Sequence, residues 1–194
     1  MKKIIDIQTK KEVIFSKTDV PMLIHGVEGS GASLFSMTVA AMLHKQGNKL
    51  IIYTAYPMAR EEFMSQIIDV HGMFYLESVK DMVKALTFQT IFIQSGNMKL
   101  FKKIISKDSI IDRIIFVKNI DIIRSSLYKS ITPFKFIIAG DLELARKNQE
   151  FKSAIYNTKI LFSPLESEPS AVLEKYQACM RNGSQEKILK ILED

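Results

Sequence analysis

The residues from Gly26 to Ser33 have the types and the spacing of a loop that binds phosphate. Gly26, Gly31 and the hydroxyl of Ser33 occupy their positions in the pattern G-x-x-x-x-G-K-[ST]. Such a loop turns successive backbone amides toward one point, and the N-terminus of the following helix adds partial positive charge. Glycine allows the close approach and the positive φ angles that this geometry needs. The predicted contact residues are Gly26, Val27, Glu28, Gly29, Ser30, Gly31, Ala32 and Ser33.

One residue of this loop departs from the pattern. Ala32 stands where the pattern has a lysine, which would reach the terminal phosphates of a bound nucleotide. Glu28 adds a carboxylate inside the loop, and it would repel a polyphosphate unless it points outward. Backbone amides hold phosphate without a lysine, so binding is predicted. The competing interpretation is a strand-to-helix turn that has lost its ligand.

An alternation of short apolar runs and longer amphipathic runs surrounds the loop. The short runs are apolar on both faces, as are strands inside a parallel sheet. Strand, helix and strand in alternation predict an α/β domain with three layers and a mostly parallel sheet. The predicted strands are Met22–His25, Leu50–Thr54, Thr90–Gln94, Ile114–Lys118, Phe136–Ala139 and Lys159–Phe162. The predicted helices are Ala32–Gln46, Ala59–Val70, Val79–Leu86, Met98–Ser106, Ile120–Ser130 and Leu142–Phe151.

The two ends of the chain have weaker patterns. Ile4–Phe15 alternates around Thr9-Lys10-Lys11, which predicts a small β-hairpin within residues 1–19. Ser170–Asp194 is basic and amphipathic and predicts two helices that break at Asn182-Gly183, with Gly183 as the helix stop. We therefore expect an α/β domain over residues 1–165 and a short C-terminal helical tail over residues 166–194.

Over residues 20–165 the chain resembles the P-loop NTPases, specifically their RecA-like and AAA+ branch. Besides the loop, Lys135–Leu144 is similar to the sensor strand of AAA+ modules, and Lys159–Pro164 is similar to their final core strand. The resemblance implies that ATP or another nucleotide binds with Mg²⁺, which the Ser33 hydroxyl would meet. It also implies assembly with itself or with an active ATPase partner.

The chain departs from the family in a second way. In the family an acidic pair called Walker B ends an apolar strand and holds magnesium, and neither candidate strand of this chain supplies it. The two candidate strands end in Gln94-Ser95 and in Lys118-Asn119, and the sequence does not choose between them. If Ile114–Lys118 lies beside the loop strand, Lys118 can replace the missing loop lysine. A solvated Lys118 is the ordinary alternative.

Three further polar residues follow predicted strands. Asp141 lies at the ligand edge of the sheet, where it is either a sensor or water-orienting acid or the N-cap of the helix at 142–151. Asp121 is interpreted as the cap of the helix that follows it. His25 is interpreted as a half-buried packing residue rather than a ligand contact.

Composition limits the class of protein. The 194 residues are 47% hydrophobic and 25% charged, which excludes a disordered or collagen-like chain. The net charge of +6 and pI near 9.3 make nucleic-acid contact possible, although the lysines are scattered. One cysteine, Cys179, excludes an intrachain disulfide and favours a cytoplasmic location. The apolar runs are too short for membrane insertion.

Together these features favour a nucleotide-binding or pseudo-ATPase subunit of an oligomeric assembly, with weak or absent hydrolysis. Whether it is an enzyme stays open, because the loop lysine and the Walker B acid are missing. One alternative is a non-catalytic scaffold or adaptor with a relic loop. The other is an accessory subunit in DNA transactions. Stabilisation by nucleotide separates the first hypothesis from the scaffold, and salt-dependent DNA binding would favour the third.

Overall fold

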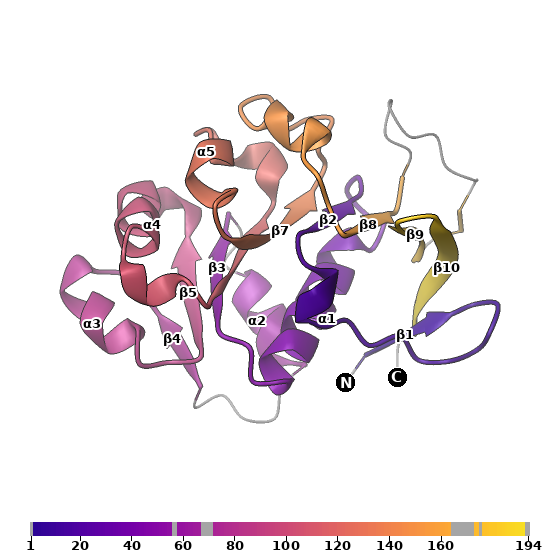
Figure 1. Ribbon diagram of the computed structural model, residues 1–194, viewed down its shortest axis with the longest axis horizontal. Coiled ribbons are helices and arrows are strands. Elements are labelled where there is room, and N and C mark those ends of the chain that lie inside the picture. The colour runs from indigo at the N-terminus through magenta and orange to yellow at the C-terminus, as the bar shows by residue number, and fades with distance from the viewer. Residues whose placement is uncertain (1, 56–57, 67–71, 164–172, 175, 193–194) are drawn as a thin grey trace.

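The computed structural model describes residues 2–55, 58–66, 72–163, 173–174 and 176–192 (Figure 1). Within them, the strands are β1 Lys3–Asp6, β2 Met22–His25, β3 Leu50–Thr54, β4 Met73–Tyr75, β5 Thr90–Gln94, β6 Ile114–Lys118, β7 Lys135–Gly140, β8 Thr158–Leu161, β9 Gln177–Asn182 and β10 Gln185–Leu192. The α-helices are α1 Ala32–Lys45, α2 Met58–Met64, α3 Met82–Ala85, α4 Met98–Ile105 and α5 Tyr128–Ile131. Short 3₁₀ turns are η1 Lys17–Asp19, η2 Val79–Asp81, η3 Ser95–Asn97, η4 Asp108–Ile110, η5 Ile120–Ile122 and η6 Gln149–Ser153.

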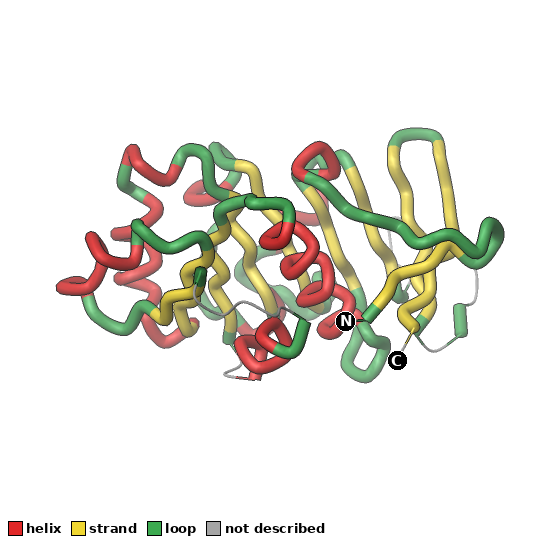
Figure 2. Tube along the Cα trace, turned by 90° about the horizontal axis from the view of Figure 1, so that it is seen from below, coloured by secondary structure: helices red, strands yellow, loops and turns green. Residues whose placement is uncertain are grey.

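The strands form one sheet in the order β1-β10-β9-β8-β2-β7-β6-β3-β5-β4. From β8 to β4 all neighbours are parallel, whereas β8, β9, β10 and β1 pair antiparallel. Figure 2 shows this antiparallel end beyond the helices that cover the rest of the sheet. The prediction of a mostly parallel sheet is confirmed, and the phosphate-loop strand β2 lies inside it.

Alternate strand residues belong to two separate cores, which explains why the strands are apolar on both faces. Ile24 and Ile52 pack with α1 and α2 on one face, together with Phe63. Leu23 and Ile51 pack on the other face with residues of α3, α4 and α5. Figure 1 shows α3, α4 and α5 grouped apart from α1 and α2. The three-layer prediction is therefore confirmed.

The predicted helical tail is wrong, because its described residues form the β9–β10 hairpin. Gly183 has a φ of +57° and lies in the hairpin turn rather than at a helix stop. In β10, Leu189 and Ile191 are buried while Lys190 between them is less so, which is the period of a strand. The free edge of β8 supplies the hydrogen-bond partners for β9. Residues 164–172, the start of the predicted tail, lie outside the described residues.

Two predicted helices are also wrong. The segment 120–130 contains only η5 and the short α5, and 142–151 contains turns and η6. In the segment 120–130 the side chain of Asn148 takes both groups of one helical hydrogen bond, because its Oδ1 accepts from Leu127 N at 2.9 Å and its Nδ2 donates to Ile123 O at 3.3 Å. Asp121 and Asp141 therefore do not cap the helices proposed for them.

The remaining elements follow the predictions with shifted ends. Val79–Leu86 is η2 followed by α3. Helix α2 covers Met58–Met64 and residues 65–66 form a turn, whereas the predicted part at 67–70 lies outside the described residues. At the N-terminus, β1 touches the returning chain through one bridge, Ile5 to Glu12, but its ladder is with β10. Strand β4 has no counterpart in the predictions. In the part of the chain described here, no helix has the length and apolarity to cross a membrane.

Candidate functional site

The loop between β2 and α1 has the backbone that the glycine spacing predicts. Gly31 precedes the first residue of α1 with a φ of +97°, and Gly29 has a φ of +78°. At Gly26 the requirement is space, because a Cβ would lie 2.6 Å from Ser30 Oγ and 2.8 Å from the Cβ atoms of Ala32 and Phe162. Any side chain at position 26 would therefore displace the loop or the end of β8.

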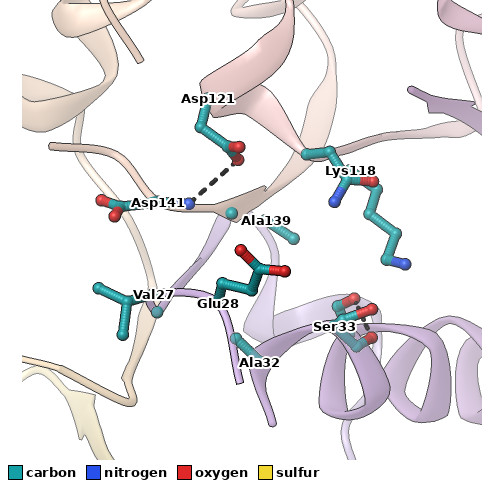
Figure 3. A pocket seen from close by; sticks show the side chains of 12 residues that line it. Val27, Glu28, Ala32, Ser33, Lys118, Asp121, Ala139 and Asp141 are labelled. Atoms are coloured by element: carbon teal, nitrogen blue, oxygen red, sulfur yellow. Dashed lines mark hydrogen bonds between the residues drawn. The ribbon is translucent and has the colours of Figure 1, made fainter. Parts of the chain in front are cut away.

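A cavity of about 260 Å³ opens between this loop and the carboxyl ends of β6 and β7. It is lined by Gly26, Val27, Glu28, Ala32, Ser33, Ser36, Lys118, Asn119, Asp121, Ala139, Gly140 and Asp141. In Figure 3, Lys118 extends on the side of Ser33, while Asp121 and Asp141 lie across the cavity. The fold thus brings the loop, Lys118 and Asp141 together, whereas Gly29, Ser30 and Gly31 do not line the cavity.

Lys118 lies at the cavity, but its strand β6 has a different position in the sheet from the one expected. Strand β7 lies between β2 and β6, so the prediction that Ile114–Lys118 neighbours the loop strand is wrong. The side chain of Lys118 is nevertheless only 3% exposed, and its Nζ lies 3.0 Å from Glu62 Oε2. Lys118 is therefore a buried, paired cation rather than a solvated one.

Glu62 of α2 connects Lys118 to the phosphate loop, and the sequence analysis did not find it. The hydroxyl of Ser33 donates to the Glu62 carboxylate at 3.2 Å to Oε2 and 3.4 Å to Oε1. Hydroxyl, carboxylate and ammonium thus form one chain, and its two end members, Ser33 and Lys118, line the cavity. In sequence Glu62 is one of several charges in an ordinary amphipathic segment, so only the packing of α1 on α2 reveals its role.

His25 is fully buried rather than half-buried, at 1% exposure. Its Nδ1 accepts from Leu142 N at 3.1 Å, and its Nε2 lies 3.1 Å from Ser163 Oγ. The ring therefore ties the end of β2 to the segments that follow β7 and β8. His25 supports the loop from behind and does not line the cavity.

The wall opposite Lys118 is acidic. Asp121 Oδ1 accepts from Asp141 N at 3.2 Å (Figure 3), and Gly140 leaves room for this contact, because a Cβ there would lie 2.5 Å from Asp121 Oδ1. Burial raises the pKa of Asp121, and the charges of Asp141 and Glu28 raise it further, against hydrogen bonds that lower it. The cavity therefore has a cationic side and an acidic side.

We expect the substitution Asp121→Asn to stabilise the protein at neutral pH. A folded-state pKa raised above the ordinary 3.8 means that the folded state binds the proton more tightly, so the free energy of unfolding falls as pH rises through this range. The amide removes the charge while its oxygen still accepts from Asp141 N. The Tm of the variant should exceed that of the parent at about pH 7, and the gain should vanish below about pH 4. A variant that is less stable at neutral pH would contradict this account.

Comparison with known proteins gives matches in structure only. No protein-family model matches the sequence, and the curated proteins contain no match to it. The structure of EccC (ATPases 2 and 3) from Thermomonospora curvata, in complex with a signal sequence peptide, aligns with a TM-score of 0.62 and 11% identity over 100% of this chain and 40% of that chain. The genome packaging NTPase B204 of Sulfolobus turreted icosahedral virus 2, in complex with AMPPCP, aligns with a TM-score of 0.63 and 13% identity over 91% of this chain and 100% of that chain.

The chain has a P-loop NTPase-like fold. The cytoplasmic domain of the type VII secretion ATPase EccC from Thermomonospora curvata also aligns, with a TM-score of 0.61 and 11% identity over 100% of this chain and 26% of that chain. The chain therefore spans less than half of either EccC chain, whereas it matches the whole of B204 in the complex described above. At these identities the likeness concerns the fold.

Proposed function

We propose that this domain binds the phosphates of a nucleotide in the cavity between residues 26–33 and the ends of β6 and β7. The observation that carries the proposal is the convergence of Lys118 with the N-terminus of α1 on one cavity. The helix start and the loop amides offer hydrogen-bond donors and partial positive charge. Lys118 supplies the full charge that Ala32 does not. The volume of about 260 Å³ suits the phosphates better than a whole nucleotide, so base and sugar would lie outside.

In this proposal hydrolysis is weak or absent. A carboxylate that orients the attacking water is expected at the end of a central strand, but β6 ends there in Lys118, and Asn119 follows it. Asp121 lies nearby, but its Oδ1 accepts from Asp141 N at 3.2 Å, which supports a structural role over that of a general base. Asp141 accepts from Glu143 N, which supports a structural role over that of a sensor. The bound nucleotide would then serve as a structural or regulatory ligand.

Assembly belongs to the same proposal. Two of the similar structures come from a secretion ATPase and one is a genome packaging NTPase, so we propose that this domain acts in the cytoplasm with further copies of itself or with an active ATPase partner. The net charge of +6 is compatible with nucleic acid as a further partner.

Thermal unfolding with ATP, ADP, GTP or tripolyphosphate at millimolar concentration tests the proposed site. A ligand at about 100 times its Kd adds about 2.7 kcal/mol of stability, which is a rise in Tm of roughly 5–10 °C for a chain of this size. The Ser33→Asp variant should lose this rise. Its side chain is exposed in the first turn of α1, where a carboxylate favours the helix but repels phosphate and the Glu62 carboxylate, so the rise is measured against the unliganded variant.

The matched control is Asn97→Asp, which makes the same change in charge at the exposed N-cap of α4, away from the cavity. This variant should keep the rise in Tm. Absence of any rise in the parent protein would overturn the proposal and favour a scaffold with a relic loop. A rise that persists in Ser33→Asp would place the ligand elsewhere.

A further inference from the structure

The fold leads one to expect a magnesium ion next to Ser33, but the ammonium group of Lys118 lies close to that position. Lys118 ends β6, where it is in register with Thr54 of β3 and Ala139 of β7. Its ammonium group lies 3.0 Å from the Glu62 carboxylate, which accepts from the Ser33 hydroxyl at 3.2 Å. The Ser33 hydroxyl, which would bind the metal ion, and the Lys118 ammonium therefore share the Glu62 carboxylate as a partner.

These residues do not fit magnesium. Mg²⁺ needs oxygen ligands in near-octahedral geometry at 2.0–2.1 Å. Ser33 and Glu62 offer such oxygens, but the Glu62 carboxylate is already paired with the Lys118 ammonium, so a divalent ion on that carboxylate would compete with this cation and repel it. The side chain of Lys118 is only 3% exposed, so its ammonium does not extend into solvent away from Glu62.

The acidic wall does not offer a better metal site. Asp121 is tied to Asp141 N, and its raised pKa, caused first by burial, disfavours the ionised form that a metal requires. Glu28 comes from the exposed loop and directs its carboxylate into the cavity (Figure 3), where it is a single carboxylate. Across the residues that the structure describes, no group of three or more His, Cys, Asp or Glu side chains is placed to hold a metal ion.

We infer that this pocket binds polyphosphate without a divalent cation, with Lys118 as its built-in counter-cation. On binding, the ammonium of Lys118 exchanges part of its contact with Glu62 for a phosphate oxygen, and the Ser33 hydroxyl is free to donate to the phosphate. Metal-free phosphate is the preferred ligand, because magnesium would reduce its charge and compete with the ammonium. This inference rests on the proposed nucleotide-binding function and specifies the ligand as the metal-free form.

The test measures the affinity of the parent protein for ADP and for tripolyphosphate by calorimetry, once with excess EDTA and once with excess Mg²⁺. The affinity in EDTA should equal or exceed the affinity in Mg²⁺. An affinity that falls ten-fold or more in EDTA would overturn the inference while leaving the proposed function intact. No binding under either condition would overturn both, so the two failures are distinguishable.

Lys118→Asp provides a second, independent arm. The new carboxylate would face Glu62 and Ser33, creating a set of oxygens that attracts Mg²⁺ and repels free phosphate. Binding by this variant should be lost in EDTA and restored at least partly by Mg²⁺, the reverse of the parent. Binding of Mn²⁺ to the parent without nucleotide, followed by electron paramagnetic resonance, needs no variant. Mn²⁺ held tightly by the parent and displaced by Mg²⁺ would contradict the inference.

Discussion

Replacement of Lys118 by Met is expected to weaken nucleotide binding roughly 30- to 1000-fold, or about 2–4 kcal/mol. This is the range found when one member of a buried charge pair between a protein and its ligand is removed, and the pair here is the Lys118 ammonium and a phosphate. Met nearly preserves the shape of the lysine stem, so packing is kept and only the charge is lost. The Glu62 carboxylate, 3.0 Å from Nζ in the parent, would then face the phosphates without compensation. Calorimetry with ADP gives the affinity directly.

The loss of the buried cation should change folding much less than binding. Glu62 is 31% exposed, so its carboxylate remains solvated when the lysine is gone. Lys99→Met makes the same change on the exposed side of α4 and should bind ADP as the parent does. If Lys118→Met binds ADP within two-fold of the parent, Lys118 is a structural ion-pair residue, and the phosphate site depends on the backbone alone.

The second large effect is expected from Gly26→Ala. One methyl group at this position meets Ser30 Oγ at 2.6 Å and the Cβ atoms of Ala32 and Phe162 at 2.8 Å. Two of these atoms are fixed close to the backbone, so the loop itself must shift. Overpacking of this kind costs about 1–3 kcal/mol, which is a fall in Tm of roughly 2–12 °C. Because the displaced segment carries the predicted phosphate contacts, binding of tripolyphosphate should fall as well.

Gly96→Ala is the matched control for this substitution. Position 96 has no heavy atom within 4 Å of an added Cβ and no positive φ, so its variant should remain within about 0.5 kcal/mol of the parent. Thermal unfolding of the three proteins, with and without tripolyphosphate, separates the effect on folding from the effect on binding. Equal stability of Gly26→Ala and Gly96→Ala would show that the loop has more room than its geometry indicates.

The same glycine geometry affects the design of binding tests. A bulky residue at Gly31 also fills the loop, but Gly31 has a φ of +97°, and an added Cβ would lie 2.6 Å from Tyr176 Cδ1. Such a variant changes the backbone and the contact with Tyr176 together with the ligand site. Ser33→Asp avoids both effects, because Ser33 lies within α1 and its side chain is exposed.

Local patterns in the sequence were sufficient for the central sheet and for the phosphate loop. The six predicted strands lie where the structure has β2, β3, β5, β6, β7 and β8, because the middle of each contributes apolar side chains to both faces of the sheet. The glycines at 26 and 31 are needed for close approach and for positive φ, which are properties of the backbone at these positions. These features depend on residues that are close in sequence, so they can be predicted from the sequence alone.

The pairing of strands and the partner of each charge were decided by the tertiary structure. Strand β9 pairs with the edge of β8, and β10 pairs with β9. The amphipathic pattern of this segment, which also suits a helix, therefore forms two strands. The placement of β7 between β2 and β6 could not be derived from either strand alone. Glu62, which joins Ser33 to Lys118, comes from a helix whose sequence is unremarkable. Long-range contacts select among local conformations of similar energy, and they place Lys118 and the loop in one cavity, with Glu62 joining the two.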